Sequence, residues 1–276
     1  MRPAPHANRH VVCLLGRLGN QLFQYSFARW LEAQTGLPAY FDLSMTRRVG
    51  IHGTPEFVNE VNRSAIRGSS RFPAPGGRLG PVGDYLRRAL GPERVVVDMT
   101  GSGPADLDPG PASWWVGYWQ QLQFAEVARA ELRSLIGIDR TPQRQSRKRI
   151  AVHVRRGDYV GLGLALSPNW YTAATDEALE LTGDAEIRVF SDDPRWCEET
   201  LQLNAPFSVA RLGTPLDDFR SLAEADVMVA SASTYSWWAG FLGAGRVIYP
   251  QGALKLQTPP AWHPVPLLGP TRKDSA

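Results

Sequence analysis

The sequence predicts an α/β protein made of two Rossmann-like halves, each built around a parallel sheet. Apolar, β-branched runs alternate with segments of helical periodicity through both halves of the 276 residues. A glycine-rich turn joins the first apolar run to a helix, as at the start of a doubly wound domain. A polar, basic stretch separates the halves, and we interpret residues 144–149 as a linker between domains at residues 1–143 and 150–276.

The first half opens with a strand, a turn and a helix. Residues 10–15 form an apolar run after His10, residues 16–20 contain two glycines, and residues 21–35 carry apolar side chains at helical spacing. Gly36 and Pro38 give the stop signal of this helix. The other elements expected in this half are strands at residues 38–42, 95–98 and 114–118, a helix at residues 122–136 and a loop at residues 69–83.

The second half repeats the alternation of strands and helices. Its first strand starts at Ile150, directly after the predicted linker. The elements that follow are helices at residues 169–181, from Pro194, at 216–225 and at 235–242, with strands at residues 186–190, 226–230 and, as the last strand, 246–249. Two such halves predict two Rossmann-like domains that face a cleft.

Composition excludes several classes of protein. A net charge of +3 and a sequence pI near 9.0 are too mild to indicate nucleic-acid binding. Cys13 and Cys197 are far apart and suit neither a disulfide framework nor a zinc site, which favours the cytoplasm. Residues 1–9 lack the apolar segment of a signal peptide, and no stretch approaches the roughly 20 apolar residues of a membrane span. Any membrane contact is therefore expected to be peripheral.

The most informative stretch is residues 150–159, an apolar strand that ends in two arginines, a glycine and an aspartate. Because side chains alternate along a strand, His153 and Arg155 project to the same side. A guanidinium at the carboxyl edge of a sheet lies where open α/β folds bind ligands, and it grips phosphate through paired hydrogen bonds. The pattern indicates a site for a nucleotide diphosphate. Solvated Arg155 and Arg156 beside an Asp158 that caps a turn fit the pattern equally well.

A second candidate is the turn from Gly16 to Gln21. It lacks the spacing of a dinucleotide-binding fingerprint. Its exposed amides and the Asn20 side chain would suit an anion or a sugar hydroxyl. Taken alone, a glycine turn before a helix is mostly structural.

A third candidate is the pair Asp192 and Asp193 at the end of a predicted strand. Paired carboxylates are typical ligands of hard divalent ions. Pro194 follows at the first position of a predicted helix, which favours an N-cap role for Asp193 over metal binding.

A fourth candidate is the hydroxyl-rich segment at residues 231–238, which follows an apolar strand and opens a helix. Ser233, Thr234 and Ser236 gather hydroxyls near the free amides of the helix N-terminus, an arrangement that favours phosphate. A hydroxyl cap followed by two core tryptophans explains the same pattern without a ligand.

Together these segments resemble the α-1,2-fucosyltransferases, glycosyltransferase family 11, over residues 16 to about 250. Five motifs occur in the order and spacing of that family: Gly16-Arg-Leu-Gly-Asn-Gln-Leu-Phe-Gln-Tyr25, Gly117-Tyr-Trp-Gln120, His153-Val-Arg-Arg-Gly-Asp-Tyr159, Phe190-Ser-Asp-Asp193 and Ser233-Thr-Tyr-Ser-Trp-Trp238. The chain departs from the pattern at Ala232, where the family usually has Asn, and at Tyr235, which replaces a common Phe.

The resemblance implies a GT-B fold and an inverting transfer of L-fucose from GDP-fucose without metal or cofactor. The acceptor would be the 2-hydroxyl of a terminal galactose, usually β-linked. The first domain would lie on the acceptor side and the second would bind GDP-fucose. A bacterial-type cytoplasmic enzyme is implied, with peripheral contact at the inner membrane when the acceptor is lipid-borne.

The resemblance also assigns roles to individual residues. Arg155 would hold the β-phosphate, and Asn20 would reach across the cleft. Independently of the resemblance, Asp158 is the candidate base because it lies beside the arginine pair at the strand end. It equally suits a partner that orients Arg155 or Arg156, and phosphate oxygens could take the proton instead. The expected catalytic residues are Arg155 and Asp158, and the expected donor-binding residues are Asn20, His153, Arg155, Arg156, Asp192, Asp218, Ser233, Thr234 and Ser236.

Two other functions are compatible with the sequence. A GT-B transferase that uses another GDP-sugar or a protein acceptor would share the arginine and the cleft. A non-catalytic glycan-binding protein would explain the nine tryptophans, but not two phosphate cradles. Nucleic-acid binding is the weakest alternative, because basic residues are dispersed outside residues 144–149.

Overall fold

The computed structural model describes residues 9–43, 94–101, 107–110, 113–138, 147–211, 214–243 and 245–267. The chain forms two compact units, Met1–Leu132 and Arg133–Ala276. The loop predicted at residues 69–83 and residues 144–146 of the predicted linker lie outside the described residues. No helix in the described parts is long and apolar enough to cross a membrane.

The first unit contains a four-stranded sheet in the order β2-β1-β4-β3, with every neighbouring pair parallel. This confirms the predicted strand–turn–helix–strand opening. The elements are β1 (His10–Cys13), α1 (Leu18–Thr35), β2 (Ala39–Asp42), β3 (Arg94–Asp98), β4 (Ser113–Gly117) and α3 (Leu122–Ile136), whose last turn counts with the second unit. The carboxyl ends of β1 and β4 are neighbours, so the turns that follow them meet at one edge of the sheet.

Aromatic packing joins α1 to the sheet of the first unit. The ring of Phe27 on α1 stacks on Trp119 with centroids 4.2 Å apart and meets Trp115 of β4 edge-on at 5.3 Å. All three side chains are fully buried, and large buried aromatic faces of this kind dominate the energetics of a core. Most tryptophans of this unit are therefore core residues rather than sugar platforms.

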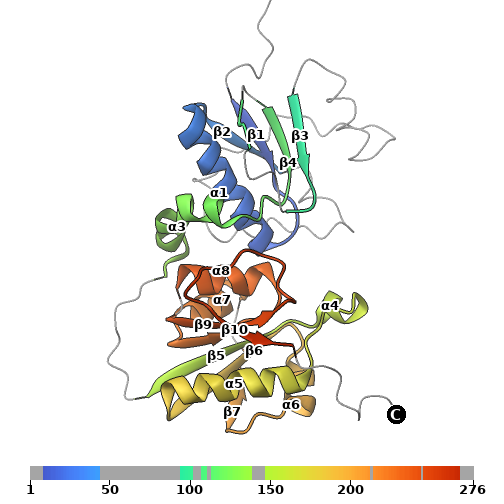
Figure 1. The fold of residues 1–276 in the computed structure, drawn as a ribbon, viewed down its shortest axis with the longest axis vertical. Coiled ribbons are helices and arrows are strands. Elements are labelled where there is room, and N and C mark those ends of the chain that lie inside the picture. The colour runs from blue at the N-terminus through green and yellow to red at the C-terminus, as the bar shows by residue number, and fades with distance from the viewer. Residues whose placement is uncertain are drawn as a thin grey trace, which may run out of the picture. The chain divides into compact units, whose positions relative to one another are not determined.

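The second unit contains a six-stranded sheet in the order β10-β9-β8-β5-β6-β7, again with all neighbouring pairs parallel. Helix α5 covers one face, and α7 and α8 cover the other (Figure 1). The elements are β5 (Lys148–Val154), α4 (Gly157–Gly161), α5 (Pro168–Thr182), β6 (Ala185–Ser191), α6 (Pro194–Thr200), β7 (Phe207–Val209), α7 (Pro215–Ala223), β8 (Val227–Val229), α8 (Thr234–Leu242), β9 (Arg246–Gln251) and β10 (His263–Pro266).

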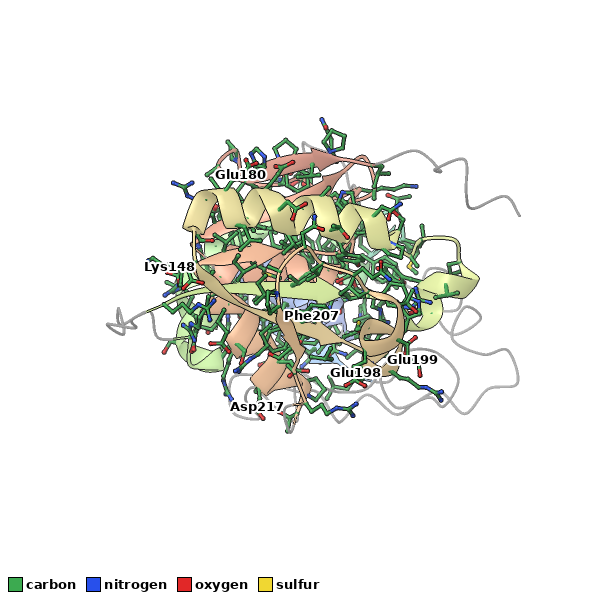
Figure 2. The ribbon with its side chains drawn as sticks, turned by 90° about the horizontal axis from the view of Figure 1, so that it is seen from below. Lys148, Glu180, Glu198, Glu199, Phe207 and Asp217 are labelled. Carbon is green, nitrogen blue, oxygen red and sulfur yellow. The ribbon has the colours of Figure 1, made fainter. Side chains whose placement is uncertain are left out.

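The strands of this sheet share one direction, which places their carboxyl ends at one edge. Figure 2 shows Lys148, the first residue of β5, on the left, and Glu198 and Glu199 of α6 on the right. β5 lies between β8 and β6, so the residues that follow these three strands are brought together. This is the edge at which open α/β sheets bind ligands.

Three elements of the second unit differ from the sequence-based prediction. The prediction that β9 is the last strand is wrong, because β10 follows it with two prolines in four residues. Prolines argue against a strand in sequence, but β10 is an edge strand, where an N–H can be missing without loss to the ladder. The short strand β7 and the one-turn helix α4 were also absent from the prediction, because so few residues carry no periodicity.

Candidate active site

The carboxyl edge of the second sheet gathers most of the residues singled out in the sequence. Arg155 and Arg156 follow β5, Asp192 and Asp193 follow β6, and a hydroxyl-rich turn follows β8. Because β8, β5 and β6 are adjacent, three motifs separated by up to 80 residues of sequence form one cluster.

The Arg155 guanidinium is held by two carboxylates. Its Nη2 donates to Asp158 Oδ1 at 2.5 Å, and its Nη1 pairs with Asp192 Oδ2 at 2.8 Å. Its Cζ atom also lies 5.4 Å from the centre of the Tyr159 ring. The two carboxylates occupy two of the five N–H donors of the guanidinium, so the remaining donors can serve an anionic ligand. Two roles were left open for Asp158, a base and a residue that orients an arginine. The contact with Arg155 favours the orienting role.

Asp192 links the ends of β5 and β6 through both of its oxygens. Oδ1 accepts from the Arg156 backbone N–H at 2.8 Å, while Oδ2 pairs with the Arg155 guanidinium. A Cβ atom on Gly157 would lie 2.6 Å from Asp192 Oδ2, so this close approach requires glycine. Gly157 therefore makes room for the carboxylate.

Arg156 points to a different set of partners. Its Nε donates to Asp193 Oδ2 at 3.3 Å, and its Cζ lies 3.8 Å from the centre of the Trp196 ring. Asp193 in turn accepts from the Trp196 backbone N–H at 3.2 Å and caps α6 ahead of Pro194, which confirms the predicted N-cap. These contacts give Arg156 and Asp193 a structural role in joining β5 to α6.

His153 is buried beneath the site and bonded to the neighbouring turn. Its Nδ1 lies 2.8 Å from Ser231 Oγ, and its ring lies 5.2 Å from that of Tyr235. Burial, and secondarily the positive charge of Arg155, lower the pKa of His153 to about 3, so the imidazole is neutral at physiological pH. With 7% of its surface exposed, His153 positions the turn after β8 more directly than it can contact a ligand.

The turn after β8 carries three hydroxyls in mutual contact. Ser231 Oγ lies 3.2 Å from Ser233 Oγ, and Ser233 Oγ lies 3.0 Å from Ser236 Oγ. Ser233 caps α8 by accepting from the Ser236 N–H, and Ser236, fully buried, donates to Ser231 O at 3.0 Å. Ser236 therefore shapes the turn from inside, while Thr234 at the first helical position stays partly exposed. The first turn of α8 contains no acidic side chain, which leaves its dipole free to favour an anion.

Tyr235 connects this turn to α7. Its ring meets Phe219 edge-on at 5.3 Å, and its hydroxyl donates to Pro215 O. Asp218 lies on α7, and its Oδ1 atom is buried and has no hydrogen-bond partner in the described parts of the chain. Burial, followed by the nearby charge of Asp217, raises the pKa of Asp218 to about 6. A buried acceptor without a donor is uncommon in folded proteins, so Asp218 stands out among the residues of α7.

Sequence reasoning did not single out Tyr159, which joins α4 to the turn after β8. Its hydroxyl donates to the backbone oxygen of Ala232 at 3.2 Å. Because this contact uses the backbone, it does not depend on the side chain at residue 232, where the chain departs from the family pattern. The only sequence signal for Tyr159 was its place at the end of the Arg155–Asp158 run.

The first unit has its own polar turn at the carboxyl edge. Asn20, in the first turn of α1, accepts at Oδ1 from Gln120 Nε2 at 2.9 Å. A Cβ atom on Gly16, whose φ is +75°, would lie 2.3 Å from Asn20 Nδ2. Trp119, next to Gln120, has a φ of +51°, a conformation uncommon for a bulky residue and frequent at functional sites. Arg17, exposed at the N-cap of α1, was not considered in the sequence.

Parallel sheets in two α/β units are the architecture of the GT-B fold. The fucosyltransferase NodZ from Bradyrhizobium has this fold. The superposition covers 86% of this chain and 92% of the NodZ chain, with a TM-score of 0.52 and 14% sequence identity. A structure of NodZ α-1,6-fucosyltransferase co-crystallised with GDP gives 0.51 at 15% identity, covering 86% and 92%.

Residues 113–251 match the model of glycosyl transferase family 11, and the chain belongs to this family. Galactoside α-(1,2)-fucosyltransferase 2 of Oryctolagus cuniculus is 24% identical over 89% of this chain and 70% of its own length. An α-1,2-colitosyltransferase of Escherichia coli is 23% identical over 84% of this chain and 87% of its own length. The family resemblance inferred from the five motifs is thereby confirmed.

Proposed function

We propose that this enzyme transfers L-fucose, with inversion, from GDP-fucose to the 2-hydroxyl of a terminal and usually β-linked galactose. The observation that carries the proposal is the Arg155 guanidinium, held by Asp158 and Asp192 beside the hydroxyl-capped N-terminus of α8. The names of the rabbit relative and of NodZ support a fucosyl donor, and the rabbit relative supports a galactoside acceptor.

In this proposal Arg155 and α8 stabilise the charge that develops on the departing diphosphate. Bond cleavage leaves the sugar oxocarbenium-like and moves negative charge onto the phosphate oxygens. The remaining N–H donors of Arg155, the first-turn amides of α8 and the Thr234 hydroxyl can meet that charge. One such preorganised contact contributes on the order of 3 kcal/mol to lowering the barrier, or about 100-fold in rate.

Asp218 is proposed to accept hydrogen bonds from the guanine base. Guanine presents two adjacent N–H groups, which match the two oxygens of a carboxylate, and among the described residues nothing donates to the buried Oδ1 of Asp218. Tyr235 lies between this residue's helix and His153 beneath Arg155, so α7 and α8 together can span a nucleotide from base to phosphate.

The preferred role of Asp158 in this proposal is to orient the Arg155 guanidinium. The alternative role is that of the base that takes the galactose proton. The two roles predict different variants. An orienting carboxylate can be replaced by Asn with part of the activity kept, because the amide oxygen still accepts from the guanidinium. A general base cannot, because the amide does not bind a proton near neutral pH.

The reaction is proposed to need neither metal nor cofactor. In the described residues Asp192 pairs with Arg155 and Asp193 with Arg156, so both carboxylates that could attract a divalent ion already face cations. The arginine and the helix amides would supply the positive field instead. We also propose a cytoplasmic location with peripheral contact at the inner membrane.

A second candidate is transfer of a different sugar to the same type of acceptor. The Escherichia coli relative is an α-1,2-colitosyltransferase, so the family tolerates donors other than GDP-fucose. A panel of GDP-sugars at equal concentration would rank the donors, and a preference of tenfold or more for another sugar would replace fucose in the proposal.

The test is GDP release from GDP-fucose with lactose as acceptor, in EDTA, beside a reaction without acceptor. We expect acceptor-dependent release and a product in which fucose is linked to the galactose 2-hydroxyl. Saturable GDP binding without release would restrict the failure to the acceptor or the sugar. Loss of release in EDTA that Mg²⁺ restores would refute metal independence, and absence of both binding and release would refute the proposal.

A further inference from the structure

The segment Gly157–Leu164, here called the α4 tip, exposes a cluster of apolar side chains next to the candidate active site. Val160 is 52% exposed, Leu162 64% and Leu164 48%. These are three of the eight large apolar side chains that the described residues expose, and they fall within five positions of the chain. Single exposed leucines need no explanation, but apolar patches of a few hundred Å² on a protein surface are often functional.

From Tyr159 onward the α4 tip belongs to a stretch of sequence without charge. Residues 159–175 contain no Lys, Arg, His, Asp or Glu, although 21% of the residues of the chain are charged. The charged residue that precedes this stretch, Asp158, is paired with Arg155. The exposed apolar side chains of the tip are therefore not interspersed with charged residues along the chain.

The tip is preformed rather than loose. Its turns are closed by backbone hydrogen bonds, among them Leu164 N to Tyr159 O at 2.9 Å and Leu162 N to Asp158 O at 3.2 Å. Its base is fixed by the Tyr159 hydroxyl, which donates to Ala232 O. A Cβ atom added at Gly161 or Gly163 would meet nothing within 4 Å, so the backbone itself faces open space. Figure 1 shows α4 standing out beyond the carboxyl end of β5.

The size and chemistry of the tip favour a lipid surface over a protein partner. Three side chains at these exposures present on the order of 300 Å² of apolar surface, whereas a specific protein interface needs about 800 Å² on each side. Partial insertion of apolar side chains at the headgroup–acyl boundary needs no such area, and the internally bonded backbone of the tip lowers its cost.

We propose that the α4 tip inserts into the surface of a lipid bilayer and holds the active site against membrane-anchored acceptors. The tip begins two residues after Arg155, so a galactoside carried on a lipid would be delivered beside the site that holds the donor. This inference rests on the proposed function and narrows its acceptor to lipid-linked glycans.

Binding is tested with the full chain and vesicles of phosphatidylcholine and phosphatidylglycerol in a 3:1 ratio. The variant carries Val160→Ser, Leu162→Ser and Leu164→Ser, and the matched control is Leu181→Ser, an exposed leucine at the far end of α5. We expect vesicle partitioning to fall by about tenfold or more in the triple variant and to stay within about twofold in the control. Equal partitioning of the wild type and the triple variant would overturn the proposal, as would no partitioning of the wild type.

Activity separates this inference from the proposed function. Fucose transfer to soluble lactose should stay within about twofold in the triple variant, while transfer to a galactosyl lipid in the same vesicles should fall about tenfold. An equal loss with both acceptors would overturn the membrane role. A wild type that partitions into vesicles but transfers fucose to neither acceptor would refute the proposed function and leave the lipid contact standing.

Discussion

The carboxyl edges of the two sheets use polar residues in opposite ways. In the first unit the side-chain amide of the fully buried Gln24 bonds to backbone groups. Its Nε2 donates to Leu15 O and Gly117 O, and its Oε1 accepts from Leu15 N. In the second unit Arg155 is paired with carboxylates, and its guanidinium keeps donors for a ligand. Motifs of similar polarity thus build the turn in one unit and hold a paired guanidinium in the other.

The largest expected effect is at Arg155. Arg155→Lys and Arg155→Ala should each lower kcat by about 100-fold or more, because an ammonium cannot serve two carboxylates and a phosphate with a planar fork. Steady-state kinetics with GDP-fucose and lactose measure this. Arg188→Lys, an exposed arginine on β6, is the matched control and should change kcat by less than about twofold. Near-normal turnover in Arg155→Lys would remove this residue from the centre of the mechanism.

The opposite behaviour is expected at Gln24 in the first unit. Gln24→Leu keeps the side-chain volume but leaves backbone groups of Leu15 and Gly117 without partners, which should cost about 2 kcal/mol or more in the free energy of unfolding. Urea unfolding followed by tryptophan fluorescence measures the loss. If Gln24→Leu were as stable as the wild type and only activity fell, the first motif would be functional rather than structural.

His153 predicts how stability depends on pH. Its pKa is lowered to about 3 in the folded protein, so the unfolded chain binds the proton more tightly. The stability contribution is complete above pH 6.5 and is lost as pH falls towards 3, by up to about 1.4 kcal/mol per pH unit. Urea unfolding at pH 7.5, 6.0 and 5.0 should show this slope, and His153→Gln should flatten it.

A smaller effect separates the two carboxylates on Arg155. Asp192→Asn should lower kcat by about tenfold, because the amide can still accept from the Arg156 N–H but no longer balances the guanidinium charge. Asp158→Asn should behave alike if Asp158 only orients Arg155. A loss of 1,000-fold or more in Asp158→Asn alone, on the order expected for a missing general base, would favour the proton-accepting role.

The smallest expected effect is a pH dependence of GDP binding. With a pKa of about 6, Asp218 loses its charge as pH falls through 6, and the Kd for GDP should rise there by a few-fold. Titration calorimetry from pH 5 to 8 measures it. Asp218→Asn should bind GDP more weakly with no such dependence, and Asp217→Asn should move the midpoint to lower pH by removing a neighbouring negative charge.

The same residue affects the stability of the fold. Because the pKa of Asp218 is raised, its contribution to stability is fullest below pH 4 and is lost by pH 6, so Asp218→Asn should be more stable at pH 7.

Long periodic elements were predictable from the sequence. Helix α3 has the predicted bounds, and β1, β5, β6 and α8 lie within about three residues of the prediction, because apolar period and glycine or proline punctuation are local signals. The edge strand β10 was missed because its prolines obey a rule that depends on the position of a strand in the sheet.

Part of the candidate site was predictable from the sequence, and part depends on tertiary contacts. Arg155, Asp192 and the hydroxyls near Ser233 were visible as residues that end strands, and parallel strands place such residues at one edge. The pairing of Arg156 with Asp193 and Trp196 was not visible, because it depends on how the end of β6 and the start of α6 meet the end of β5. The Tyr159–Ala232 contact likewise joins segments 73 residues apart.

The sequence by itself determined the alternation of strands and helices, the family, and the residues that reach the carboxyl edge of the second sheet, because periodicity, caps and motifs are encoded over short distances. Tertiary structure alone decided which carboxylates pair with each arginine, that Gly157 leaves room for Asp192, and that Gln24 and Ser236 serve the backbone. Those outcomes depend on contacts between strands and helices remote in sequence, where burial and distance, rather than residue type, set the chemistry.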